Sequence, residues 1–224
     1  MSAVPLVALR DEALGYGAGA VLRQITLSVA PGERVVLLGR SGAGKSTLLG
    51  ALHDRIVGGG HRVALVPQDH ALVPQLSVRH NVLMGRLDDR SAAYNLTSLL
   101  RVRSRDRAEI DAILDRVGLG EEAPRAVEGL SGGQKQRTAL ARALYRGGAA
   151  LIADEPVSAV DEGQAGRLLD EMSAAFGTAI LALHDVGQAR AFATRLIGLR
   201  GGRIAFDAAP GEIGAGELER LYAA

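Results

Sequence analysis

The sequence predicts an α/β fold with a mixed sheet, an antiparallel strand pair near the N-terminus and a helical subdomain inserted into the core. Three short apolar runs lack any alternation with polar residues, which is typical of strands covered on both faces. They span residues 35–38, 149–153 and 178–183. Helical patterns lie between these runs, so we expect the strands to form a largely parallel sheet.

The N-terminal residues are expected to form the antiparallel pair. Residues 5–14 and 21–29 have the composition of strands, and the glycine-rich stretch 15–19 between them indicates a turn. An antiparallel piece therefore precedes the parallel part of the fold.

The region between residues 71 and 146 has mostly helical patterns and no buried strand. Ser77 is expected to cap a helix that runs toward Gly85. Residues 107–117 place apolar side chains at helical spacing, and Gly118 is a plausible end of that helix. We expect one domain over residues 1–224, with a core at about 1–70 and 147–224 and a helical subdomain at about 71–146.

The composition limits the classes of function. Of 224 residues, 47% are hydrophobic and 23% charged, which excludes a disordered chain. A net charge of +1 argues against a nucleic-acid partner, which requires a broad basic surface. The absence of cysteine excludes disulfides, zinc–thiolate sites and a cysteine nucleophile. No apolar run reaches the roughly 20 residues that span a bilayer, and no leader pattern is visible, so we expect a cytoplasmic protein.

Residues 39–46 read G-R-S-G-A-G-K-S, which fits the phosphate-loop pattern G-x-x-x-x-G-K-[ST]. The pattern follows an apolar strand and precedes a helical run at 46–51, which disfavours the alternative of a simple capping turn. Glycines let backbone N–H groups point at phosphates, and Lys45 brings a compact ammonium to the β- and γ-phosphates. Ser46 is expected to bind Mg²⁺ and Thr47 to reach the α-phosphate. The predicted phosphate contacts are Gly39, Arg40, Ser41, Gly42, Ala43, Gly44, Lys45, Ser46 and Thr47.

Polar side chains follow two of the predicted buried strands. Asp154 and Glu155 come directly after 149–153, at the ligand-binding edge of such a sheet. We expect Asp154 to hold Mg²⁺ through water and Glu155 to polarise the attacking water. His184 ends the run 178–183 and is a candidate γ-phosphate sensor. The alternatives are an acidic surface turn and a capping histidine.

A second candidate anion site lies at Ser131-Gly132-Gly133-Gln134, ahead of another helical run. Taken alone, this segment favours an ordinary helix cap over an anion site. Two anion sites in one chain suggest that each completes a site on another copy.

These motifs occur in an order that resembles the ATPase subunits of ABC transporters. The resemblance rests on the phosphate loop, Gln68 after Pro67, the L-S-G-G-Q signature at 130–134, the Asp154-Glu155 pair, S-A-V-D at 158–161, and His184. It implies MgATP hydrolysis in a head-to-tail homodimer that drives two membrane permease subunits at the cytoplasmic face of the inner membrane. A solute-binding protein would be an indirect partner.

The same resemblance implies roles for further residues. Tyr16 is similar to the aromatic residue that stacks on adenine. Gln68 corresponds to the residue that links the γ-phosphate and Mg²⁺ to the membrane subunits. Ser131 and Gly133 would contact the γ-phosphate held by the opposite subunit, and residues 158–161, including Asp161, would connect the two sites.

A finer resemblance, to the ATPase subunits of phosphonate importers, rests on residues 72–78, 81–87, 153–158 and 218–222. It implies phosphonate or a related phosphorus oxyanion as cargo. The alternatives are an exporter, an importer of another solute, or a soluble ABC ATPase without transport. One departure from the family is the short segment between Lys45 and Gln68, which implies a trimmed antiparallel sheet.

Residues 68–82 are expected to couple nucleotide state to a membrane partner. Ala71, Leu72, Val73 and Leu76 are more apolar than a free surface loop requires, which favours a groove for a cytoplasmic helix. The alternative is that these side chains pack inward.

Overall fold

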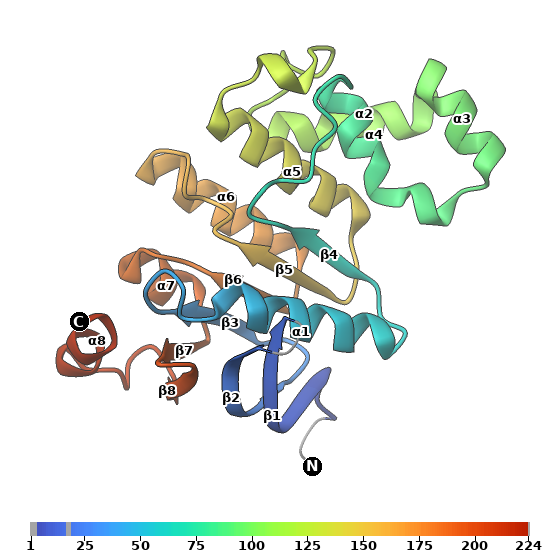
Figure 1. Cartoon of the computed structure of the whole chain (residues 1–224). Coiled ribbons are helices and arrows are strands. Elements are labelled where there is room, and N and C mark those ends of the chain that lie inside the picture. The colour runs from blue at the N-terminus through green and yellow to red at the C-terminus, as the bar shows by residue number, and fades with distance from the viewer. Residues whose placement is uncertain (1–3, 17–18, 224) are drawn as a thin grey trace.

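The computed structural model describes residues 4–16 and 19–223, without the side chains of Tyr16 and Leu99. A six-stranded sheet in the order β4-β5-β6-β3-β7-β8 forms the centre of the molecule (Figure 1). Neighbouring strands from β4 to β7 are parallel, and β8 is antiparallel to β7. The strand bounds are Arg34–Leu38 for β3, Val63–Val66 for β4, Ala150–Asp154 for β5, Ala179–Ala182 for β6, Arg195–Arg200 for β7 and Arg203–Ala208 for β8.

The two N-terminal strands form a separate antiparallel pair, as predicted. They are β1 (Val7–Tyr16) and β2 (Gly19–Val29), and Val7 lies opposite Val29. The strands extend further toward each other than the predicted turn at 15–19, of which residues 17–18 lie outside the described part of the chain.

The burial of alternate residues in β3 explains why this strand is apolar from Val35 to Leu38. In β3, Val35 and Leu37 face one apolar cluster with helix α1 (Lys45–Gly58), while Val36 and Leu38 face a second cluster on the opposite side. Both faces are therefore covered, which explains the uninterrupted apolar run. Figure 1 shows α1 between the six-stranded sheet and the β1–β2 pair.

The regular elements between β4 and β5 are all helical. Figure 1 shows α2 to α5 gathered at the β4 end of the sheet. Ser77 caps α2 as predicted, because its hydroxyl accepts a hydrogen bond from the His80 amide. The bounds are Val78–Leu83 for α2, Met84–Asp89 for the 3-10 helix η1, Ala92–Leu100 for α3, Ser104–Arg116 for α4, Val127–Gly129 for η2 and Gly132–Arg146 for α5.

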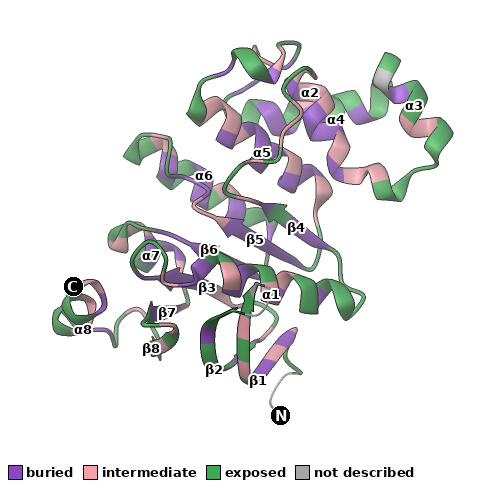
Figure 2. Cartoon of the chain, in the orientation of Figure 1, coloured by how far each residue is buried: buried purple, intermediate pink, exposed green. Residues whose placement is uncertain are grey.

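The face of the sheet opposite to α1 packs against part of α5 and against the remaining helices α6, α7 and α8. Their bounds are Glu162–Ala175 for α6, Val186–Phe192 for α7 and Ala215–Tyr222 for α8. Figure 2 shows the buried residues concentrated in the sheet strands, while α3 is largely exposed or half-buried. Within the described residues, none of the helices has the length and apolar character needed to cross a membrane.

Candidate active site

The phosphate loop joins β3 to α1 and is shaped by glycines. Gly39, Gly42 and Gly44 have φ angles of 148°, 79° and 99°, which residues with a Cβ atom rarely adopt. A Cβ on Gly44 would also lie 2.5 Å from a methyl group of Leu22. Helix α1 starts at Lys45 with no acidic residue in its first turn, so its free N–H groups favour an anion.

Lys45 is buried against the loop that it belongs to. Its side chain is 6% exposed, and Nζ donates hydrogen bonds to the carbonyl oxygens of Gly39 at 2.8 Å and Arg40 at 3.2 Å. Burial lowers the pKa of Lys45, while the negative charges of Glu155 and Asp154 partly oppose that shift. The carbonyl groups of the loop therefore hold the Lys45 ammonium at the loop.

A cavity of about 240 Å³ lies over the phosphate loop and brings distant predicted residues together. Gln68 and Glu155 line it from the ends of β4 and β5, opposite the start of α1. The loop and helix residues that line it are Ser41, Gly42, Gly44, Lys45, Ser46 and Thr47, and Val21 contributes from β2. This cavity joins most of the predicted phosphate contacts to the predicted catalytic carboxylate.

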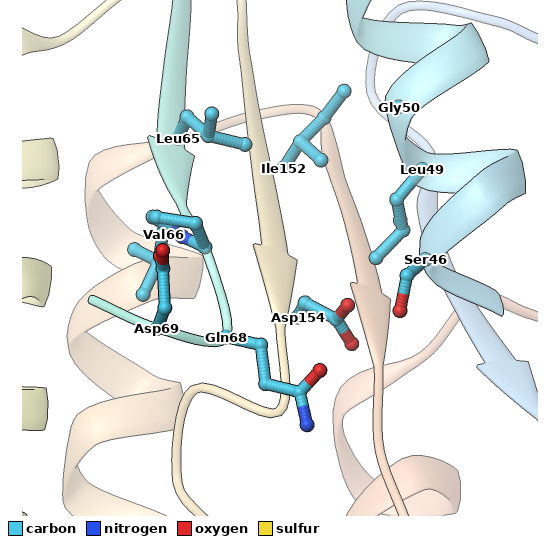
Figure 3. Close-up of a pocket in the computed structure, with 10 residues that line it drawn as sticks. Ser46, Leu49, Gly50, Leu65, Val66, Gln68, Asp69, Ile152 and Asp154 are labelled. Carbon is cyan, nitrogen blue, oxygen red and sulfur yellow. The ribbon is translucent and has the colours of Figure 1, made fainter. Parts of the chain in front are cut away.

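A second cavity of about 460 Å³ lies between α1 and the edge strand β4 (Figure 3). Figure 3 shows Ser46, Gln68 and Asp154 near one end of it and the apolar side chains of Leu65 and Ile152 away from that end. A hydroxyl, an amide and a carboxylate supply the hard oxygen atoms that Mg²⁺ prefers. The chemistry of these side chains therefore fits the predicted Mg²⁺ site.

The apolar part of this second cavity lies beside Leu65 of β4 and Ile152 of β5. Leu65 points to the face of the sheet that α1 covers elsewhere, yet it remains 37% exposed. The predicted departure from the family, one helix followed by one strand, is present in the chain.

Glu155 and His184 meet at the ends of β5 and β6. His184 Nε2 lies 2.5 Å from Glu155 Oε1, and the Glu155 backbone has a φ angle of 53°. The Glu155 side chain is 21% exposed and the His184 side chain 49% exposed. The two predicted residues are thus in contact with each other, and Glu155 lines the cavity over the phosphate loop whereas His184 is not among its lining residues.

Gln136, whose role is not indicated by any sequence pattern, lies on α5 and is 3% exposed. Its Nε2 group donates to the Glu155 carbonyl oxygen at 2.7 Å and to Ser158 Oγ at 3.2 Å. Its Oε1 atom accepts from the Ala159 amide at 3.0 Å. Its place two residues after the signature is visible in the sequence, but no local spacing indicates a contact with residues 155–159.

Arg142, also on α5, is a second residue whose role is not indicated by any sequence pattern. Its guanidinium donates to the carbonyl oxygens of His70 at 2.7 Å and Ala71 at 2.5 Å. Both residues have positive φ angles, 61° and 45°. Burial lowers the pKa of Arg142, and the charge of Asp69 partly opposes that shift.

The segment 68–82 is less exposed than predicted. Ala71 is exposed, but Leu72, Val73 and Leu76 are half-buried, and Leu72 packs against the main apolar cluster. The Asn81 side chain explains this conformation, because it bonds to the backbone N–H and carbonyl of Val73 at 2.8 and 3.0 Å. The alternative interpretation, in which these side chains pack inward, therefore applies to Leu72, Val73 and Leu76.

The signature residues form a helix cap. Ser131 Oγ accepts from the Gln134 amide at 3.3 Å, and Gln134 Oε1 accepts from the Ser131 amide at 3.0 Å, which is a capping box at the start of α5. Ser131 and Gly132 are exposed, and Gly133 is half-buried. Among the described residues, those that line the two cavities above do not include this segment.

Two further predicted residues differ in how far the structure describes them. Asp161 is exposed and caps α6, because its Oδ1 atom accepts from the Gln164 amide at 2.9 Å. Tyr16 is the last residue of β1, and its side chain lies outside the described part of the chain. The predicted stacking on adenine stays a prediction.

Comparison with known proteins agrees with these motifs. The model of a family described as ABC transporter matches residues 22–59 and 53–158. A phosphite import ATP-binding protein of Stutzerimonas stutzeri is 40% identical over 92% of this chain and 83% of its own length. A phosphonates import ATP-binding protein of Anaeromyxobacter dehalogenans is 36% identical over 98% of this chain, which spans about half (49%) of that relative.

Solved structures share the fold. A dimeric ATP-binding cassette in a post-hydrolysis state with ADP and Pi superposes with a TM-score of 0.77 at 24% identity, covering 91% of this chain and 98% of its own. A component of an ABC transporter complex from Clostridium perfringens has a TM-score of 0.73 at 25% identity, over 96% of this chain and 93% of its own. The chain therefore belongs to the ABC transporter family.

Proposed function

We propose that this chain hydrolyses MgATP in a head-to-tail homodimer and thereby powers import of phosphonate or a related phosphorus oxyanion. The observation that carries the catalytic part is the cavity in which Lys45, Gln68 and Glu155 converge on the phosphate loop. The cargo rests on the relatives, which are named as phosphonates and phosphite import ATP-binding proteins.

The phosphate loop and Lys45 bind the triphosphate of ATP, with the α1 N-terminus stabilising the phosphate charge. Ser46, Gln68 and Asp154 would hold Mg²⁺, which neutralises charge on the transferring phosphate. Glu155 orients a water molecule and accepts its proton. His184, at 2.5 Å from Glu155, fixes that carboxylate and contacts the γ-phosphate.

The dimer follows from the exposed signature. Ser131, Gly132, Gly133 and Gln134 lie at the start of α5, where the N–H groups of Gly132 and Gly133, which the capping box does not use, can bind a γ-phosphate from a second copy. Asp161 contributes to the connection between the two sites. Tyr16 stacks on adenine in this proposal, as the resemblance implies.

The partner surface is proposed at the junction of the core (about 1–70 and 147–224) and the helical subdomain (about 71–146). A cavity of about 280 Å³ there is lined by Pro67, Ala71, Met84 and Arg142, among others. It would receive a cytoplasmic helix of each of two permease subunits, at the cytoplasmic face of the inner membrane. A solute-binding protein would deliver cargo on the other side.

The catalytic proposal is tested with Glu155→Gln in the full chain. We expect ATP affinity to stay within about twofold, because the phosphate loop is unchanged, while hydrolysis falls about 100- to 1,000-fold. MgATP should then drive a monomer-to-dimer shift in light scattering, because the trapped nucleotide bridges two copies.

Ser131→Arg in the Glu155→Gln background serves as the dimer control, since bulk and charge at the signature should block the shift. Normal turnover by Glu155→Gln would remove this carboxylate from its role. A monomer at saturating MgATP would contradict the shared site.

The cargo and partner proposals are tested by growth of a strain that lacks this gene. We expect loss of growth on methylphosphonate or phosphite as the only phosphorus source and normal growth on phosphate. The wild-type gene should restore growth. Ala71→Glu should not, because it places a charge in the proposed partner cavity.

Ala174→Glu, which makes the same change on the exposed face of α6, is the matched control and should restore growth. Growth of the deletion strain on methylphosphonate and phosphite would contradict the cargo. Restoration by Ala71→Glu would contradict the partner surface.

A further inference from the structure

We propose that Gln136 is a positioning residue for catalysis, which holds the backbone of Glu155 in the conformation that presents its carboxylate to the nucleotide site. This inference rests on the proposed role of Glu155. Gln136 is not among the predicted site residues, and it lies on α5, the helix that begins with the signature.

The conformation of Glu155 needs external support. Its φ angle of 53° lies in the left-handed region, which is unfavourable for a residue with a Cβ atom. Such conformations persist where the surrounding structure determines them, and they cluster at functional sites. Neighbouring groups must therefore hold the Glu155 backbone in this conformation.

Both sides of the Glu155 backbone are bonded. Its amide donates to the Ala182 carbonyl at 3.1 Å, which is a contact with the neighbouring strand β6. Its carbonyl accepts from Gln136 Nε2 at 2.7 Å, from Ser158 Oγ at 3.1 Å and from the Ser158 amide at 3.3 Å. Strand β6 fixes the amide side of the peptide, while the carbonyl side is held by the local residue Ser158 and, with the shortest of the three bonds, by Gln136 of α5.

Gln136 uses its full amide for this turn. One Nε2 group donates to both the Glu155 carbonyl and Ser158 Oγ, and Oε1 accepts from the Ala159 amide at 3.0 Å. The side chain is nearly inaccessible to solvent, so water cannot readily replace these bonds. A neutral amide with two donors and an acceptor is therefore matched to the turn 155–159.

The placement of Gln136 also connects two sites of the proposed dimer. It lies on α5, whose first residues carry the signature, and Gly133 packs so closely that a Cβ there would meet the Ala159 carbonyl oxygen at 2.7 Å. A displacement of the α5 N-terminus on meeting a second copy would therefore be transmitted to the Glu155 carbonyl. Docking of one copy would thus orient the catalytic carboxylate of the other.

The test is Gln136→Met in the full chain, which removes all three hydrogen bonds and keeps the length and burial of the side chain. We expect ATP affinity within about twofold of the wild type and a kcat reduced by about 10- to 100-fold, because small misplacements of a catalytic group have effects of this size. Gln188→Met, on α7, is the matched control and should change neither quantity.

A second readout separates positioning from general packing. In a protein that already carries Glu155→Gln, Gln136→Met should cause no further loss of hydrolysis, because the group that it positions is gone. A purely structural role would reduce the residual rate again. Ser158→Ala, at an exposed residue, provides a variant that does not disturb the core, and it should lower kcat by a smaller factor with ATP affinity unchanged.

The outcomes distinguish the inference from the proposed function. If Glu155→Gln hydrolyses ATP normally, the role of Glu155 itself is wrong. If Glu155→Gln is inactive but Gln136→Met and Ser158→Ala keep wild-type kcat, only the positioning role is overturned. A loss of ATP affinity equal to the loss of kcat in Gln136→Met, or additive losses in the double variant, also overturns it.

Discussion

The phosphate loop and the turn at Glu155 line the same cavity, but they are held in place in different ways. The loop is local: Lys45 bonds to carbonyls five and six residues away, and three glycines of the same segment supply its shape. The turn has local bonds from Ser158 to the Glu155 carbonyl, but it depends in addition on distant groups, since Gln136 lies 19 residues before Glu155 and His184 lies 29 residues after it. The shape of the phosphate loop is therefore determined within one segment, while the position of Glu155, the proposed catalytic carboxylate, also depends on α5 and on His184 at the end of β6.

The largest effect that we expect from this difference concerns the phosphate loop and is a loss of ATP affinity. Lys45→Ala should weaken ATP binding roughly 100-fold, because it removes charged hydrogen bonds to the phosphates. The loss should appear in affinity, measured by titration with a fluorescent ATP analogue. Gln136→Met, by contrast, should reduce kcat and leave affinity unchanged. Equal affinities for Lys45→Ala and the wild type would contradict a phosphate role for this lysine.

Lys45 also gives the binding step a predictable pH dependence. Burial lowers its pKa from the ordinary value of 10.5, so the ammonium is lost at a lower pH than usual in the free protein. ATP affinity should therefore fall as the pH rises through this lowered pKa, since the neutral amine no longer attracts phosphate. Lys45→Arg should bind more weakly at neutral pH but show no such fall, because guanidinium stays charged.

The same shift has a consequence for stability of the free protein. Between the lowered pKa and 10.5, the unfolded chain carries a proton on Lys45 that the folded chain has released. The free energy of unfolding should therefore rise with pH in that window. A denaturant titration of the wild type against Lys45→Arg isolates this contribution.

The phosphate loop, which is shaped by local contacts, is also the part of the site that could be predicted from the sequence. The apolar runs identified β3, β5 and β6, because strands covered on both faces show no alternation, and the G-x-x-x-x-G-K-S pattern identified the loop between β3 and α1. Ser77 was recognised as a cap from its residue type and place. In each case the determining contacts lie within a few residues of one another.

The remaining features depend on contacts that no spacing records. Gln136 and Arg142 are ordinary helix residues in the sequence, and only the packing of α5 against the sheet edge brings them to Glu155 and His70. The half-buried state of Leu72 likewise depends on tertiary packing, here against the main apolar cluster. The short connection before Gln68 was visible, but the cavity beside Leu65 follows from which face of β4 α1 leaves uncovered.

The smallest predicted effect concerns the second turn that α5 holds. His70 and Ala71 have positive φ angles, and the Arg142 guanidinium binds both of their carbonyls. Arg142→Met should destabilise the protein by about 1–2 kcal/mol, because these carbonyls lose a charged donor, and should increase amide exchange in residues 68–76. ATP affinity should stay near the wild-type value, because the phosphate loop does not contact Arg142.

Hydrogen exchange and denaturant unfolding of the full chain measure both quantities. Arg167→Met, at an exposed position on α6, removes the same charge and should change neither. If exchange in 68–76 is the same in Arg142→Met and the wild type, that turn is fixed locally, as the phosphate loop is. In that case α5 would hold only the turn at Glu155. Gln136 would then be the one α5 residue of the two, Gln136 and Arg142, whose distant contacts hold a turn in place.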